Sequence, residues 1–226
     1  MLDETMTPAA PKPANGPHAV VLTRDWRADM VVHAVGLAAG TAGAVALVIA
    51  VIRSATPHQW LPAAVYVAGL LAMLGCSAAY NAWGSHGRRP WLRRLDHAAI
   101  FAMIAGTYTP VALHLSPPWD AGLAAAVWTV AGAGILLKLW QPHRIEAISV
   151  VLYLLLGWMG AAAAGELLAS IPARPLALIL AGGVVYSAGV VFHLASGWRY
   201  QAALWHLSVL AGATLHFFAV LALVAP

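Results

Sequence analysis

The polar residues that could do chemistry in this chain are few, and they gather at the ends of apolar segments. Asp96 and His97 open one apolar run, and Ser77 and Asn81 close the run before it. Ser77 and Asn81 are four residues apart, so they share one face of a helix. A carboxylate costs roughly 2.5–3.5 kcal/mol near the centre of a bilayer and less toward its edge, so it commonly marks a functional site. Asp96 is therefore the first candidate site residue.

The composition places these residues in a membrane. The chain has 226 residues, of which 62% are hydrophobic and 9% are charged, and its mean hydropathy is +0.78. A helix needs about 20 apolar residues to cross a bilayer, and this chain has several such runs. We therefore predict an all-α, polytopic membrane protein. The basic residues lie in short loops rather than along one helix face, which argues against nucleic acid as a partner.

Seven apolar segments are predicted to span the membrane and to form one compact bundle, because the connections between them are short and contain Pro or Gly. Most Lys and Arg residues fall on the N-terminal side, so the N-terminus is predicted to be cytoplasmic and the C-terminus outside. Lys138 and Trp140 are interpreted as anchors at the membrane interface. The segments are 30–52, 61–83, 97–115, 121–140, 145–164, 176–194 and 203–224.

Two regions are predicted along the chain. Residues 1–25 are rich in Pro and Ala and lack the apolar core of a signal peptide, so we expect a disordered cytoplasmic tail. Residues 26–226 are predicted to form a single seven-helix transmembrane domain.

This topology brings polar residues from separate segments to one membrane depth, near the cytoplasmic ends of their helices, at 1.5 Å of rise per residue. A polar cluster of Ser77, Asn81, Asp96 and His206 is therefore predicted between the helices. His97 points about 100° away from its neighbour Asp96, so the two are not expected to serve one centre. The residues at this depth are His33, Ser77, Asn81, Asp96, His193 and His206.

The residues from Asp96 to Pro110, DHAAIFAMIAGTYTP, resemble the third-helix signature of the haemolysin III proteins, the bacterial branch of the progestin and adipoQ receptor family. The similarity continues in Ser77-x-x-Tyr80, in His33-x-x-Gly36 and in Trp205-His206-Leu207, in the same order along the chain. It covers nearly everything after about residue 25.

The resemblance implies seven helices, a cytoplasmic N-terminus, a place in the bacterial inner membrane and a zinc site near the cytoplasmic face. In the family, one histidine from an S-x-x-x-H motif and two from an H-x-x-x-H motif hold the metal, and the helix-3 aspartate reaches it through water. Here the motifs are Ser77-x-x-x-Asn81 and Ala202-x-x-x-His206, so only His206 keeps a ligand position. An amide is a poor zinc ligand and a methyl group is none, so a degenerate zinc site is expected.

Two arrangements of the cluster stay open. One is a metal-free, hydrogen-bonded cluster that holds the helices together. The other is a rearranged zinc site with His33, His206 and Asp96 as its ligands, and His193 is a further candidate to replace a missing one.

The family is linked to lipid signalling, to ceramidase-like amide hydrolysis and to haemolysis. The leading hypothesis is a non-catalytic membrane protein that acts in lipid sensing or homeostasis, with membrane lipids as its partners. The alternative is a metal-dependent lipid amide hydrolase in which Asp96 and Ser77 are the candidate catalytic residues. A cytolysin comes last, because no segment carries a polar stripe suited to a wide pore.

Overall fold

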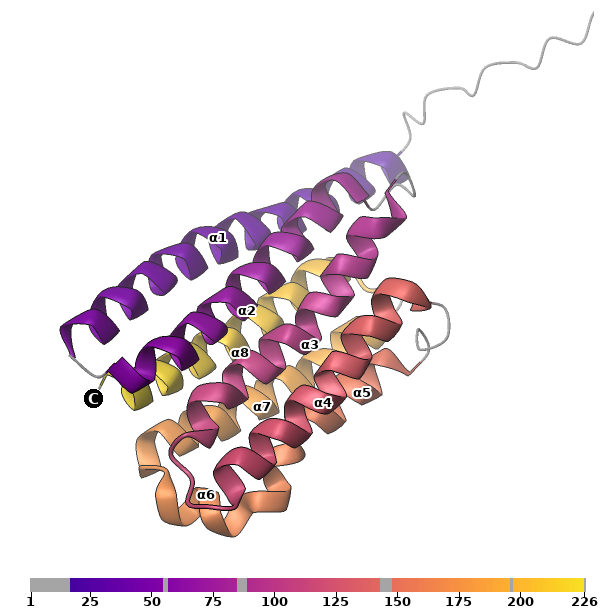
Figure 1. Ribbon diagram of the computed structural model, residues 1–226. Coiled ribbons are helices and arrows are strands. Elements are labelled where there is room, and N and C mark those ends of the chain that lie inside the picture. Colours follow the sequence, from indigo (N-terminus) through magenta and orange to yellow (C-terminus); the bar gives the residue numbers. More distant parts are fainter. Residues whose placement is uncertain (1–16, 55–56, 85–88, 143–147, 196, 226) are drawn as a thin grey trace, which may run out of the picture.

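The computed structural model describes residues 17–54, 57–84, 89–142, 148–195 and 197–225, and all regular secondary structure within these ranges is helical (Figure 1). Residues 159–163 form a short 3₁₀ segment, η4, which links α5 to α6 without a break. The α-helices are α1 Pro17–Arg53, α2 Trp60–Ala79, α3 Pro90–Ala112, α4 Trp119–Trp140, α5 Ser149–Gly157, α6 Ala164–Ser170, α7 Ala173–Leu194 and α8 Gln201–Val224.

Six helical stretches among the described residues are long and apolar enough to cross a membrane. They correspond to six of the seven predicted segments, and the stretch from α5 to α6 counts as one of them. The remaining segment is α3, which is 23 residues long but carries more polar side chains, among them Asp96, His97 and Thr107. The six stretches are Arg24–Arg53, Pro57–Trp83, Trp119–Trp140, Ser149–Ser170, Ala173–Leu194 and Gln201–Val224.

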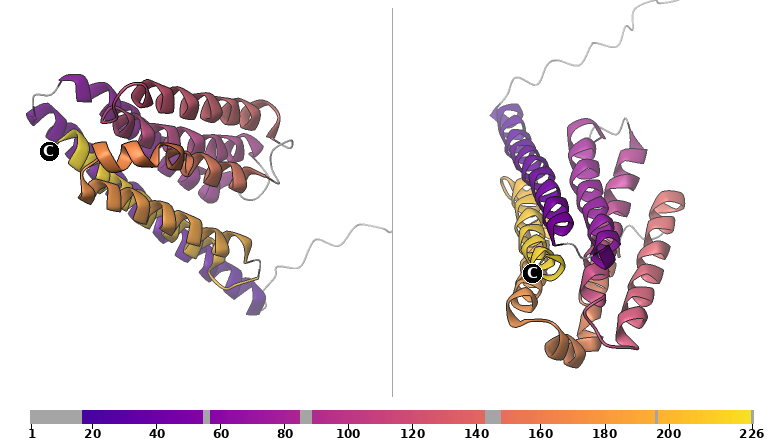
Figure 2. Two further views of the ribbon diagram at one scale, coloured as in Figure 1. Left: turned by 90° about the horizontal axis from the view of Figure 1, so that it is seen from below. Right: turned by 60° about the vertical axis from the view of Figure 1, so that its left-hand side comes forward.

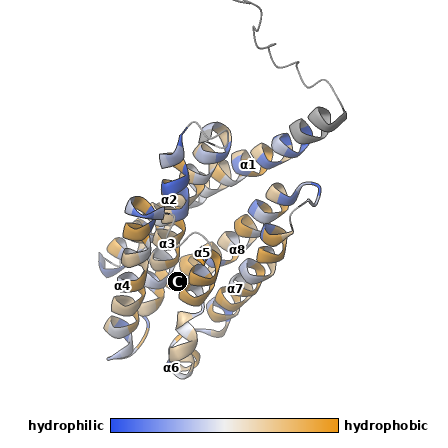
Figure 3. Cartoon of the chain, turned by 90° about the vertical axis from the view of Figure 1, so that its right-hand side faces the viewer, coloured by the Kyte–Doolittle hydropathy of each residue, from blue (hydrophilic) through white to orange (hydrophobic). Residues whose placement is uncertain are grey.

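The helices form a bundle with α3 near its middle. α3 lies between α2 and α4 and also contacts α8, while α1 lies between α2 and α8, and α7 packs along α8 (Figures 1 and 2). The stretch from α5 to α6 contacts α3, α4 and α7, so it closes the bundle between α4 and α7. Figure 3 shows apolar colour along α4, α5 and α7, with the more polar residues toward the helix ends.

Close contact between α2 and α3 depends on two glycines. A Cβ added at Gly69 would lie 3.0 Å from the carbonyl oxygen of Ala102, and one added at Gly106 would lie 3.2 Å from that of Val65. Small residues let helix backbones approach closely where neighbouring lipid offers no hydrophobic driving force. These two positions therefore fix how α3, which carries Asp96, sits against α2, which carries Ser77.

α1 begins at Pro17, well before the first predicted segment. Residues 17–25 of the predicted tail therefore belong to a helix, and residues 1–16 lie outside the described residues. The longer helix carries Asp29 into the bundle, where only 4% of its surface is exposed. The sequence prediction had left this aspartate just outside the membrane segment.

The interpretation of Lys138 as an interfacial anchor is wrong. Its side chain is fully buried, because it lies on the face of α4 that also carries Val127, Ala131 and Gly134 and packs against α3. Its Nζ atom has no hydrogen-bond partner among the described residues. Trp140 remains 76% exposed, as expected for an interfacial residue.

Candidate functional site

A cavity of about 640 Å³ extends through the bundle and is lined by residues of α1, α2, α3, α5, α6, α7 and α8. Most of its lining is apolar, including Met73, Ile100, Ile179 and Val209. The volume falls within the roughly 300–1,000 Å³ that is usual for pockets that bind small molecules. The cavity can therefore hold a sizeable apolar ligand.

The polar residues predicted to share one depth gather at this cavity. Five of the six line it: His33, Ser77, Asp96, His193 and His206. Asn81, predicted in the same cluster, is not in the lining, whereas His97, which was not expected to serve the same centre as Asp96, is. Asp96 is buried and lies near Ser77 and His206, close enough to interact electrostatically with both. His193 packs against the indole of Trp205, with the ring centres 5.0 Å apart.

His33 of α1 is held on one side by α2 and by η2, the π-helical turn Tyr80–Gly84 that follows α2 and carries Asn81, and on the other side by its own helix. Its Nδ1–H donates to the backbone carbonyl oxygen of Asp29 at 2.9 Å, and its Nε2 accepts from the Asn81 amide at 3.2 Å. The Ser77 hydroxyl lies 3.3 Å from the same Nε2 atom. This pattern assigns the proton of a neutral imidazole to Nδ1. Because Nδ1 is engaged by a backbone carbonyl rather than by a carboxylate, Ser77 and His33 do not form part of a Ser–His–Asp triad.

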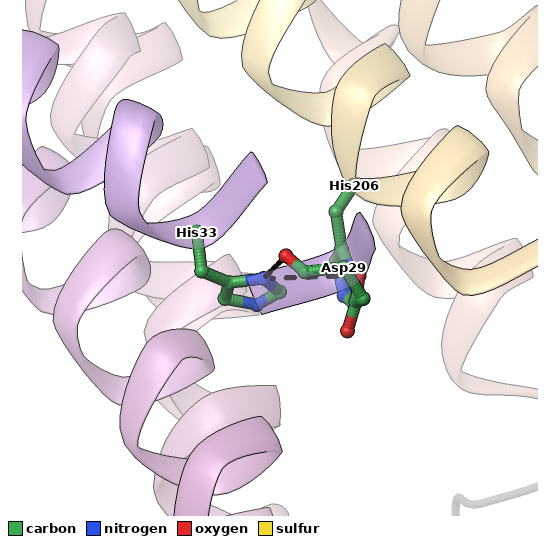
Figure 4. Close-up of side chains that lie close together, drawn as sticks. All are labelled: Asp29, His33 and His206. Atoms are coloured by element: carbon green, nitrogen blue, oxygen red, sulfur yellow. Dashed lines mark hydrogen bonds and ion pairs between the residues drawn. The ribbon is translucent and has the colours of Figure 1, made fainter. Parts of the chain in front are cut away.

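Asp29 is the site residue that sequence reasoning missed. Its Oδ1 atom accepts a hydrogen bond of 2.6 Å from Nδ1 of His206 and lies 3.8 Å from Nδ1 of His33 (Figure 4). The two imidazole rings meet edge to face, with their centres 4.3 Å apart. The arrangement joins α1 to α8 through a short, charge-assisted hydrogen bond.

Asp29, His33 and His206 have the spacing of a metal-binding group. Each offers one ligand atom, and these atoms all lie within 4.8 Å of one another. Asp96, predicted as a possible ligand with His33 and His206, and His193, predicted as a possible replacement, do not belong to this group. The structure thus brings together two of the predicted metal residues and adds an aspartate from one turn earlier in α1.

A comparison with known protein families shows which family this chain belongs to. The Haemolysin-III related family matches residues 27–217, which is most of the sequence. The chain belongs to that family. The predicted resemblance is therefore confirmed, and the protein is a multi-pass membrane protein of the Haemolysin-III related type.

Bacterial and animal proteins are similar to it. Hemolysin-3 of Bacillus cereus is 40% identical over 133 residues, 58% of this chain and 61% of that protein. The Hemolysin-3 homolog of Bacillus subtilis (strain 168) is 29% identical over 195 residues, 86% of this chain and 92% of that protein. The human Monocyte to macrophage differentiation factor is 25% identical over 192 residues, 77% of this chain and 78% of that protein.

The three ligand positions that the Haemolysin-III resemblance implies do not fit a metal here. The Asn81 amide is occupied by hydrogen bonds to His33 and to the backbone carbonyl of Ser77, the latter at 3.0 Å. The Ala202 side chain is a methyl group on an exposed face of α8. Only His206 can ligate, so a metal held at this cavity needs ligands from elsewhere in the chain.

A sequence signal for Asp29 was present. Asp29 and His33 are spaced four residues apart, which places both side chains on one face of a helix. Recognising it required the helix to start earlier than the apolar run does. The polar residues Arg24, Asp25 and Arg27 just before it instead favoured a boundary at residue 30.

Proposed function

We propose that this Haemolysin-III related protein takes a membrane lipid into its cavity and acts in lipid sensing or lipid homeostasis. The acyl chain would occupy the apolar part of the cavity, and the polar head would lie at the end formed by His33, Ser77, Asp96 and His206. The proposal rests on one observation: most of the cavity lining is apolar, and polar side chains gather at one end of it.

The outer side of the cavity supports entry from the bilayer. Trp158, Leu168 and Leu180 line the cavity, yet they are 40%, 72% and 48% exposed on the outside of the bundle. In a bilayer, exposed apolar residues of this kind face lipid tails. A ligand can therefore reach the cavity sideways, between η4–α6 and α7, without leaving the membrane.

We place α3 as the seventh span, with the N-terminus in the cytoplasm and the protein in a bacterial inner membrane. At 1.5 Å per residue its 23 residues reach about 34 Å, enough for a bilayer core. Its polar residues face the interior of the bundle, as the burial of Asp96 and Thr107 shows, so they do not have to face lipid. The excess of Lys and Arg on the N-terminal side favours this orientation.

The test is lipid capture by the purified full chain in nanodiscs that contain a photoactivatable ceramide or fatty acid. Gly157 lines the cavity and a Cβ there would meet nothing within 4 Å, so Gly157→Phe should fill the space without a backbone clash. We expect crosslinking to the cavity residues to fall several-fold in that variant. Gly165→Phe is the matched control, because Gly165 is equally open but lies outside the cavity lining. Equal labelling of the wild type and Gly157→Phe would overturn the proposal.

A second candidate is hydrolysis of a lipid amide or ester. It is favoured by the position of the buried Asp29 carboxylate and the two imidazoles at the end where a lipid head would lie. If a divalent metal is held there it would supply a bound water of lowered pKa, and Asp96 would orient the head group or accept a proton. Release of free fatty acid from the crosslinking lipid, absent in Asp96→Asn, would distinguish hydrolysis from binding alone.

A further inference from the structure

We infer that the protein binds a divalent metal, with zinc as the best fit, through Asp29, His33 and His206, which differ from the ligands at the family positions. The implied family ligand positions are those of Asn81, Ala202 and His206. The proposed site keeps His206 of α8 and replaces the other two positions with Asp29 and His33 of α1. This inference does not depend on lipid binding.

The first support is that three potential ligand side chains from two helices meet at one place. Asp29 and His33 stand on one face of α1, and His206 reaches them from α8, far away in the sequence (Figure 4). The side chains of Asp29 and His33 are 5% and 6% exposed, and that of His206 is 18% exposed. A carboxylate so far from water needs a cationic or hydrogen-bonding partner, and two imidazoles are the groups that meet it.

The second support is the chemistry of the donor set. Two imidazoles and one carboxylate form a set that catalytic zinc sites use, with the fourth position left for water or substrate. Two ligands of a tetrahedral zinc lie about 3.3 Å apart, given metal–ligand bonds of about 2.0–2.1 Å. The observed 2.6 Å and 3.8 Å between Asp29 Oδ1 and the two histidines bracket that spacing. Movements of well under an ångström in these two distances, within the reach of side-chain rotation, would suit a metal.

The third support is the surroundings of His33. When Nδ1 of His33 ligates a metal, the imidazole proton sits on Nε2, which lies 3.3 Å from the Ser77 hydroxyl oxygen of α2 and can donate to it. Metal-binding histidines are commonly oriented by such hydrogen bonds, and their loss typically lowers metal affinity by about 10- to 100-fold. Ser77 would thus orient a ligand of the metal.

Metal content of the detergent-purified full chain tests this directly. Elemental analysis after zinc loading and removal of free metal should give about one zinc per chain, and cobalt loading should give the visible absorption bands of a tetrahedral site. We expect zinc affinity to fall by more than 100-fold in Asp29→Asn and in His206→Gln, and Asp29→Glu should retain binding.

His114→Gln is the matched control. His114 also bonds to the carbonyl four residues earlier, Pro110, at 3.0 Å, but it lies just beyond the C-terminal end of α3 and outside the candidate metal group. Its zinc content should equal that of the wild type. Monodisperse elution and the helical circular-dichroism spectrum report whether each variant is folded, separately from its metal. The inference is overturned if the loaded wild type holds no zinc, or if folded Asp29→Asn binds zinc as tightly as the wild type.

Discussion

The hydrogen bond between Asp29 and His206 should dominate the energetic link between α1 and α8 in metal-free protein. We consider the variants Asp29→Leu and His206→Phe and their combination, all in the presence of a chelator. Each single substitution leaves one buried partner without its hydrogen bond, whereas the double substitution removes both partners at once.

The structure sets the expected magnitude. The bond is 2.6 Å long and its partners are 5% and 18% exposed, so solvent and salt screen it little. A hydrogen bond that involves a charged group contributes about 1.5–3 kcal/mol. Stranding a buried charge costs about 3–5 kcal/mol, and replacing both partners with apolar groups can be almost neutral. The double variant should therefore lose less stability than the two single variants added together, by about 1.5–3 kcal/mol.

The assay is equilibrium unfolding in mixed micelles, followed by tryptophan fluorescence, for the wild type, the three variants and a second cycle. The second cycle pairs Asp29→Leu with His114→Gln, which lies just beyond the C-terminal end of α3 and shares no hydrogen-bond partner with Asp29 among the described residues. Substitutions that share no partner should add within about 0.3–0.5 kcal/mol. If the cycle of Asp29 and His206 were additive to the same degree, the contact would contribute nothing and the reasoning about this site would fail.

Three further outcomes are expected. Ser77→Ala should lower zinc affinity by about 10- to 100-fold, measured by competition with a chelator, because the Ser77 hydroxyl lies 3.3 Å from Nε2 of His33 and orients that ring. Gly69→Ala should lower the free energy of unfolding by about 1–3 kcal/mol, because the added Cβ would meet the α3 backbone. Gly132→Ala is the control: its Cβ would meet no atom within 4 Å, so the substitution should raise the free energy of unfolding by less than about 1 kcal/mol. Lys138→Met should raise the temperature of unfolding, because the ammonium group is fully buried and its Nζ has no hydrogen-bond partner among the described residues; a lower temperature would show that the charge has a stabilising role.

Hydrophobic runs predicted the helices well because length and apolarity are direct requirements of a membrane span. They predicted the start of α1 poorly, because a helix can continue through polar residues once it leaves the lipid. Lys138 shows a related limit. An apolar run predicts that a helix spans the membrane. It does not predict which side chains of α4 face α3, because that depends on how the two helices pack.

The residues of the site were predicted in part, because their depth in the membrane follows from their positions along the helices. Depth alone predicted that His33, Ser77, Asp96 and His206 lie near one membrane plane, since they are at similar distances from the ends of their helices. The structure adds that all four line one cavity. Depth does not say which neighbours touch. Asp29 was overlooked because it precedes the apolar run, and its partner, His206, is 177 residues away.

The metal-free cluster and the metal centre use the same atoms, so they are two states of one set of side chains. In the metal-free state His206 donates the proton on Nδ1 to Asp29 Oδ1, and ligation through that nitrogen must displace this proton and part the two atoms from 2.6 Å. The strength of the hydrogen bond therefore opposes metal binding. At 1.4 kcal/mol for each factor of ten, about 1.5–3 kcal/mol corresponds to roughly a 10- to 150-fold weaker affinity than an open site with the same ligands would have. Asp29→Glu, which keeps the carboxylate but alters the length of the bond, should separate the two effects: a lower stability without metal together with a higher affinity for zinc is the signature of this competition.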